Sequence, residues 1–332
     1  MFAKETILVL GAGASMPYGF PSGRKLVDEI ITGLSGIYDK GSLFSIVRKK
    51  RCLRSEFINR LIFSDCESVD AFLEKKQNQD LVEIGKQSIA IALLEHERED
   101  RFFSKYRSGR RDWYSQLFSR LNEGLHFEEV QKNKISIITF NYDRSLEYYL
   151  ATALSNLYRK SMEKSQEILD AIPIIHVHGK VGRLPWDKIS DQDEQKSSCH
   201  TVPFGGKALS FRWIWRQNET ILRAAMGIRI IPEEMDDTPE FIKARELLQN
   251  AKKIFFLGFG FHPTNIRRLS LTQLEDPSIQ CTTLGLSADR HKFLDQFKTR
   301  KGNAIFCSKM GTGHVVRQDK DIWHFIHEVG LY

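Results

Sequence analysis

Polar residues that could act on a small molecule stand at the ends of apolar runs in this chain. Asn141 and Asp143 follow the run 135–140 (ISIITF), and His178 lies near the end of the run 172–179 (IPIIHVHG). An asparagine can orient water or a hydroxyl group without carrying charge, and an aspartate can accept hydrogen bonds from a carboxamide. A histidine can take up a proton near neutral pH. Asn141, Asp143 and His178 are therefore the candidate catalytic residues.

Plainer structural roles compete with these assignments. Asn141 or Asp143 could simply cap the helix expected in the segment RSLEYYLATAL, because both residue types favour that position. His176 and His178 project from the same face of a strand, but no third metal ligand stands nearby and the five cysteines form no C-x-x-C pair. No metal is expected. His176 is interpreted as a hydrogen-bonded core residue and His178 as facing a ligand.

Two glycine-rich turns also follow apolar runs. Residues 11–15 (GAGAS) come after the run 6–10, and residues 258–265 (GFGFHPTN) end the run 253–260. Glycines allow a backbone to approach a phosphate, although a tight turn alone would also explain them. Met16 replaces the third glycine of a dinucleotide fingerprint, and no acidic residue ends a second strand about 20 residues later. A hydride-transferring dehydrogenase is therefore disfavoured.

The elements that must position these residues alternate along the chain. Strands are expected at 6–10, 135–140, 172–179, 227–232, 253–260, 282–287 and 304–308. Ser22, Thr238 and Ser287 are expected to begin helices, because each precedes a helical pattern as a capping residue does. Alternation of strands and helices predicts an α/β fold: a Rossmann-type doubly wound parallel sheet that binds ligands at the carboxyl ends of its strands.

One domain of residues 1–332 is expected, with a mostly helical insertion at about 40–130 and a smaller excursion at about 180–226. The composition, 41% hydrophobic and 27% charged, is that of a soluble globular protein. No apolar run reaches the roughly 20 residues that cross a bilayer, so no membrane contact and a cytoplasmic location are expected. The net charge of +7 is modest, and direct nucleic-acid binding is not expected.

Taken in order, the motifs GAGAS, GFPSG, TFNYD, VHGK and GFGFHPTN resemble those of the sirtuin superfamily. The chain looks most like the sirtuin-like effectors of bacterial anti-phage defence, which share a helix of the type SVDAFL and the late GFGF turn. The resemblance implies that Asn141 and Asp143 hold the nicotinamide riboside end of NAD+ and that His178 is the catalytic base. It also implies a phosphate loop at Gly11, Ala12, Gly13 and Ser15, a flexible cofactor loop at Phe20 and Pro21, and adenosine contacts at Gly258, Gly260 and Ser287.

The chain departs from the deacylases of that superfamily because it lacks the two cysteine pairs of their zinc ribbon. This favours a glycohydrolase that cleaves NAD+ as its substrate into nicotinamide and ADP-ribose. A zinc-free deacylase, an ADP-ribosyltransferase and a non-catalytic NAD-binding scaffold are the alternatives. Free NAD+ hydrolysis would harm the host cell, so a homo-oligomer or a partner subunit is expected to gate it; the resemblance suggests a HerA-like ATPase or a nucleotide-sensing protein.

Overall fold

The structure is a computed structural model. It describes residues 1–36, 44, 47, 51–75, 78–103, 112–187, 201–205, 214–232, 235–275, 277–295, 315–318, 320–329 and 331.

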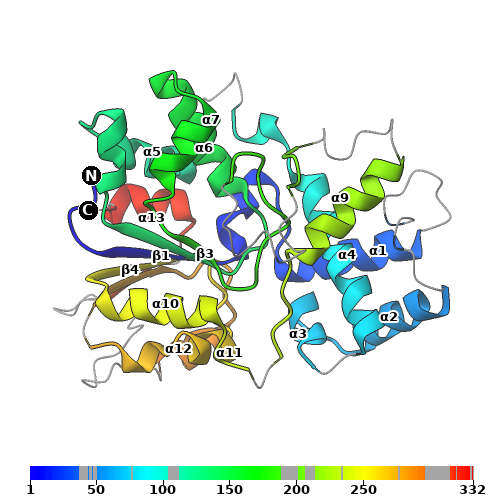
Figure 1. The fold of residues 1–332 in the computed structure, drawn as a ribbon. Helices are drawn as coiled ribbons and strands as arrows, with labels where there is room; N and C mark the ends of the chain where they lie inside the picture. Colours follow the sequence, from blue (N-terminus) through cyan, green and yellow to red (C-terminus); the bar gives the residue numbers. More distant parts are fainter. Residues whose placement is uncertain are drawn as a thin grey trace.

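A six-stranded parallel sheet forms the centre of the fold (Figure 1). Its strands are β1 (Thr6–Leu10), β2 (Ile135–Thr139), β3 (Ile174–His176), β4 (Lys253–Leu257), β5 (Ser278–Thr282) and β6 (Val315–Gln318). Their spatial order is β3-β2-β1-β4-β5-β6, and every neighbouring pair is parallel. The strand order therefore reverses between β1 and β4, which is where doubly wound sheets bind ligands. The predicted α/β class with a parallel sheet is confirmed.

Helices cover both faces of the sheet. Successive residues of a strand point to opposite faces, and apolar residues occur on both. In β1, Leu8 and Leu10 join one buried cluster, whereas Ile7 and Val9 join another. The first cluster includes residues of α5 (Trp113–Asn122), α6 (Ser145–Tyr158), α7 (Met162–Leu169) and α13 (Ile322–Val329). The second includes residues of α10 (Pro239–Asn250), α11 (Pro263–Arg268) and α12 (Ala288–Asp295), as Figure 1 shows on the opposite side.

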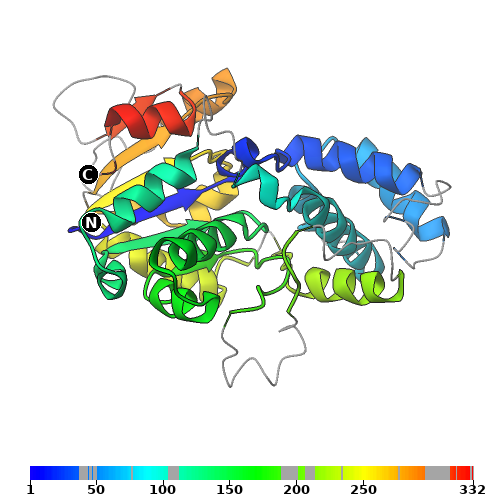
Figure 2. The ribbon, with the colours of Figure 1, turned by 90° about the horizontal axis from the view of Figure 1, so that it is seen from above.

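A helical lobe stands beside the carboxyl edge of the sheet (Figure 2). It contains α1 (Gly23–Ser35), α2 (Arg51–Phe63), α3 (Val69–Leu73), α4 (Gln79–His96) and α9 (Ile214–Met226). Ser22 caps α1 as predicted, since its side chain accepts a hydrogen bond from the Lys25 amide. α9 packs on α4 although more than 100 residues separate them, so two distant stretches of chain build one lobe. None of the helices in the described residues has the length and apolar character needed to span a membrane.

Several strand predictions differ from the structure, and one cannot be compared with it. Residues 227–232 are not a strand: Ile228 forms only an isolated antiparallel bridge with Gly179, and the run is apolar because Ile228 and Ile231 are buried. The strand expected at 282–287 overlaps β5 only at Thr282, the last residue of β5, and the residues after it form a turn. The strand expected at 304–308 lies outside the described residues, and β6 was not predicted. β3 is also shorter than the run 172–179.

Candidate active site

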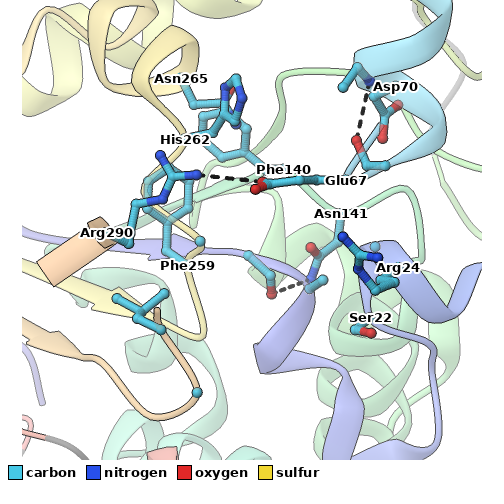
Figure 3. Close-up of a pocket in the computed structure, with 18 of the residues that line it drawn as sticks. Ser22, Arg24, Glu67, Asp70, Phe140, Asn141, Phe259, His262, Asn265 and Arg290 are labelled. Carbon is cyan, nitrogen blue, oxygen red and sulfur yellow. Dashed lines mark hydrogen bonds and ion pairs between the residues drawn. The ribbon is translucent and has the colours of Figure 1, made fainter. Parts of the chain in front are cut away.

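A pocket of about 550 Å³ opens at the carboxyl edge of the sheet, next to the reversal of strand order (Figure 3). Turns that follow β1, β2, β3, β4 and β5 contribute to one side of it. The helical lobe supplies the other side through the start of α1 and through α3 with the residues just before it. This volume lies within the range of small-molecule sites.

Half of the residues predicted for the site line this pocket. They are Gly11, Ala12, Asn141, His178, Gly260 and Ser287. The other predicted residues do not line it; these are Gly13, Ser15, Phe20, Pro21, Asp143 and Gly258.

Three groups of Asn141 form hydrogen bonds within the protein: its backbone amide, its backbone carbonyl oxygen and its side-chain Nδ2. This leaves the side-chain Oδ1 for a ligand. Its amide N–H donates to Thr139 Oγ1 at 3.1 Å, and its carbonyl oxygen lies 2.9 Å from His176 Nδ1. Its side-chain Nδ2 donates to the Gly11 carbonyl oxygen at 2.9 Å and to Ser15 Oγ at 3.0 Å. Because both donors of the carboxamide point into the protein, Oδ1 is the atom that can accept a hydrogen bond from a bound molecule.

Asp143 lies behind the pocket wall. Its carboxylate accepts hydrogen bonds from Ser15 Oγ at 2.7 Å, from the Ser145 amide at 3.1 Å and from the Ser145 hydroxyl. Burial raises the pKa of Asp143, and these hydrogen bonds oppose that effect. The N-cap residue of α6 is Arg144, so Asp143 is not the cap considered as its alternative; it lies one residue earlier and accepts from the amide of Ser145, the first residue of the helix. Ser15 forms hydrogen bonds with both Asp143 and Asn141, so Ser15 and Asp143 together orient the Asn141 side chain from within the protein.

The two histidines at the end of β3 have different surroundings. His176 is buried, with Nε2 at 2.7 Å from Glu147 Oε1 and Nδ1 at 2.9 Å from the Asn141 carbonyl oxygen, as expected of a core residue. His178 lines the pocket, and within the described residues its ring nitrogens have no hydrogen-bond partner. The rings of Phe140, Tyr142 and Phe241 surround it at 5.7, 6.2 and 5.9 Å between centroids.

Burial lowers the pKa of His178 to about 3, with a smaller contribution from the positive charge of Arg268. The imidazole is therefore neutral at pH 7 and can exchange hydrogen bonds with a ligand hydroxyl. A pKa this low makes it a weak proton acceptor, which differs from the near-neutral base expected from the sequence.

The neutral state of His178 should make stability depend on pH. Between about pH 3 and the ordinary pKa of 6.5, the unfolded chain holds a proton at this position and the folded chain does not. Its contribution to the free energy of unfolding is therefore complete above pH 6.5 and is lost as the pH falls toward 3, by about 1.4 kcal/mol per pH unit at most.

Urea unfolding of wild type and His178→Phe between about pH 5 and about pH 7 tests this dependence. The variant should lose less stability on acidification than wild type. His327→Phe is the matched control, because His327 is exposed on α13 and stacks on Trp323. Equal pH dependence in wild type and His178→Phe would contradict the buried neutral state.

The glycines of the GAGAS turn serve close packing between two strand exits. A Cβ atom at Gly11 would lie 2.6 Å from the Gly258 carbonyl oxygen, and one at Gly13 would lie 2.7 Å from Gly258 Cα. The amides of Gly11, Gly13 and Ala14 already donate to carbonyl oxygens of the protein. Among the amides of residues 11–14, only that of Ala12 lacks an acceptor in the described structure. Most of the predicted phosphate loop is therefore occupied by internal hydrogen bonds.

The predicted cofactor loop is anchored inside the protein. Phe20 and Pro21 are buried, and the Phe20 ring packs against His96 of α4 at 6.3 Å between centroids. Trp113 Nε1 donates to the Ala14 carbonyl oxygen at 2.8 Å. The loop therefore sets the position of the start of α1, whose Ser22, Gly23 and Arg24 line the pocket.

Several pocket residues were not identified from the sequence. Figure 3 shows that they come from both sides: Arg24, Glu67 and Asp70 from the helical lobe, and His262, Asn265 and Arg290 from the sheet side. Arg290 Nη2 lies 3.5 Å from Glu67 Oε2, so an ion pair joins the two sides. The SVDAFL helix was noticed as a family feature, but nothing in its local pattern indicates that Asp70 reaches the end of β2.

Comparison with models of protein families finds no match, and comparison with curated proteins finds none either. Within the described residues, no group of three or more His, Cys, Asp or Glu side chains is arranged to hold a metal ion. The function therefore has to be argued from the pocket itself and from the ordered motifs.

Proposed function

We propose that the protein is an NAD+ glycohydrolase of the sirtuin-like type, which cleaves the nicotinamide–ribose bond and so depletes NAD+ in anti-phage defence. The observation that carries the proposal is that Asn141 Oδ1 and the His178 ring nitrogens, which have no hydrogen-bond partner within the described residues, lie in one pocket. The parallel sheet and the order of motifs along it support the sirtuin-like assignment.

The pocket suits an extended ligand with two ends. Along the edge of the sheet, His178 follows β3, Asn141 follows β2, Gly11 follows β1, Gly260 follows β4 and Ser287 follows β5. Neighbouring strands lie about 4.8 Å apart, so these positions span about 19 Å. A dinucleotide can lie across such an edge, with its reactive end at Asn141 and His178 and its far end at Ser287.

Two arginines supply positive charge within the pocket lining, and one of them, Arg290, is paired with Glu67. Arg24, at the start of α1, points toward Asn141 in Figure 3, and Arg290 lies on the far side. A pyrophosphate carries two negative charges, and guanidinium groups bind phosphate oxygens through paired N–H donors. These side chains can bind the phosphates in place of the GAGAS amides, most of which already form hydrogen bonds within the protein.

The chemistry requires little acid assistance. Nicotinamide in NAD+ is a cationic leaving group, and the electron pair of the breaking C–N bond neutralises its ring as it departs. Positive charge then develops on the ribose. Asn141 Oδ1 can accept a hydrogen bond from a ribose hydroxyl or from water, and neutral His178 can hydrogen-bond a second hydroxyl. The rings of Phe140 and Tyr142 keep this end of the pocket largely apolar.

Incubation of the pure chain with NAD+ tests the proposal. We expect nicotinamide and ADP-ribose in equal amounts, without any acceptor peptide, measured by chromatography. Activity is expected to depend on self-assembly or on a partner subunit, so the assay includes several protein concentrations and the product of the neighbouring gene. Acetyl-ADP-ribose from an acylated peptide, or ADP-ribosylated protein, would indicate the deacylase or transferase instead. Tight binding of NAD+ that stays intact under every condition would indicate a scaffold.

A further inference from the structure

Hydrolysis leaves one chemical task that the predicted residues do not perform. The attacking water must lose a proton as its oxygen bonds to the ribose carbon. His178 is a weak base because its burial lowers its pKa to about 3. Asp143 is buried behind the wall and bonded to Ser15 and Ser145, so it does not reach the pocket. A different proton acceptor is needed at this end.

Three carboxylates line the pocket, and two of them form ion pairs with arginines. Glu67 pairs with Arg290 at 3.5 Å. Glu74 pairs at 3.1 Å with Arg268, whose side chain is fully buried. The third is Asp70, and no arginine or lysine pairs with it in the described residues. Asp70 is therefore the carboxylate of the pocket that is available to take a proton.

The surroundings of Asp70 hold it next to the catalytic residues. The Tyr142 hydroxyl donates a hydrogen bond to Asp70 Oδ1, and the Tyr142 ring lies edge-on to His178 at 6.2 Å between centroids. Tyr142 thus joins Asp70 to the turn that carries Asn141. The Ser68 side chain caps α3, and the Glu74–Arg268 pair fastens this short helix to the sheet side.

We propose that Asp70 is the general base that activates water in this pocket, a role that rests on the proposed glycohydrolase function. In the step, the water oxygen bonds to the ribose carbon, the C–N bond breaks with its electron pair going to nicotinamide, and the water proton moves to the Asp70 carboxylate. The proton then leaves to solvent, so NAD+ and water give nicotinamide, ADP-ribose and one proton.

The protonation chemistry of Asp70 fits this role. Burial raises its pKa above the ordinary range, while the Tyr142 hydrogen bond opposes the rise. A carboxylate with a raised pKa is a stronger base than an exposed one, and it stays ready to accept a proton while it is ionised. The hydrolysis rate should therefore fall as the pH drops through the pKa of Asp70.

Azide provides the decisive test, because it is an anionic nucleophile that needs no base. Asp70→Ala should hydrolyse NAD+ about 10²- to 10³-fold more slowly than wild type, with a KM changed by less than about threefold. Added azide should restore nicotinamide release and yield azido-ADP-ribose. Asp70→Asn is the second variant, since it keeps the shape and can still accept from Tyr142. Asp65→Asn is the matched control, because Asp65 is exposed just before α3 and adopts a φ of 47° that asparagine tolerates.

The outcomes separate this inference from the function on which it rests. Near-wild-type hydrolysis by folded Asp70→Asn, or a slow Asp70→Ala that azide does not restore, would overturn the role of Asp70 while NAD+ cleavage stands. If wild type releases no nicotinamide in any condition, with or without azide, the glycohydrolase function itself fails. Retention of the acidic decline of the rate in Asp70→Asn would also overturn the assignment.

Discussion

Replacing Asn141 with alanine should lower the kcat of NAD+ hydrolysis by about 10³-fold. The substitution removes the Oδ1 acceptor that is aimed at the pocket by the hydrogen bonds to Gly11 and Ser15. Because the transition state carries more positive charge on the ribose than the ground state, the loss should affect kcat more than KM. Steady-state kinetics of nicotinamide release measures both.

The control for this variant is Asn156→Ala, since Asn156 is exposed on α6 and its side chain donates to the Thr152 carbonyl oxygen of the same helix. It should hydrolyse NAD+ at the wild-type rate. The Asn141 variant should also remain folded, because losing its internal hydrogen bonds costs only about 1 to 2 kcal/mol. Full activity of a folded Asn141→Ala protein would remove Asn141 from the mechanism.

Gly258→Ala should be among the most destabilising single substitutions in the chain, lowering the free energy of unfolding by about 4 kcal/mol. Gly258 has a φ of 58°, in the left-handed region that side chains disfavour. Its Cβ atom would lie 2.3 Å from the Ala14 amide nitrogen and 2.4 Å from the Gly13 carbonyl carbon. Both are backbone atoms of the neighbouring strand exit, so neither can move without displacing the turn.

Gly260→Ala is the matched control two residues further on. A Cβ atom at Gly260 would meet nothing within 4 Å in the described structure, so stability should change by less than about 1 kcal/mol. Urea unfolding of the two variants beside wild type measures the difference. Similar stabilities for Gly258→Ala and Gly260→Ala would contradict the close packing of the β1 and β4 exits.

The local pattern predicted much of the fold because it reports which residues are buried and where helices begin. The run 6–10 is β1, Thr238 caps α10 through the Phe241 amide, and the side chain of Ser287 accepts from the Arg290 amide at the start of α12. It failed at 227–232, since an apolar run shows burial and does not show whether a neighbouring strand is present to pair with it.

The sequence also predicted that the turns after the strands gather at one place, and these turns line one pocket because parallel strands share one carboxyl edge. Asn141, His178 and Ser287 come from three such turns and line one pocket. Which atom of each turn faces the pocket was not predictable. The resemblance assigned Gly11 and Gly13 to phosphate binding, whereas their short contacts are with the Gly258 backbone.

Sequence by itself determined the alternating elements, the helix caps and the set of polar residues at the strand ends, since these depend on neighbours in the chain. Only the tertiary structure decided that Asp70 lines the pocket and that Asp143 does not. Asp143 turns inward because Ser15 and Ser145 donate to it, while Asp70 arrives from a helix more than 60 residues earlier and meets Tyr142. Such a placement depends on how the helical lobe packs against the sheet, and no local pattern encodes that long-range contact.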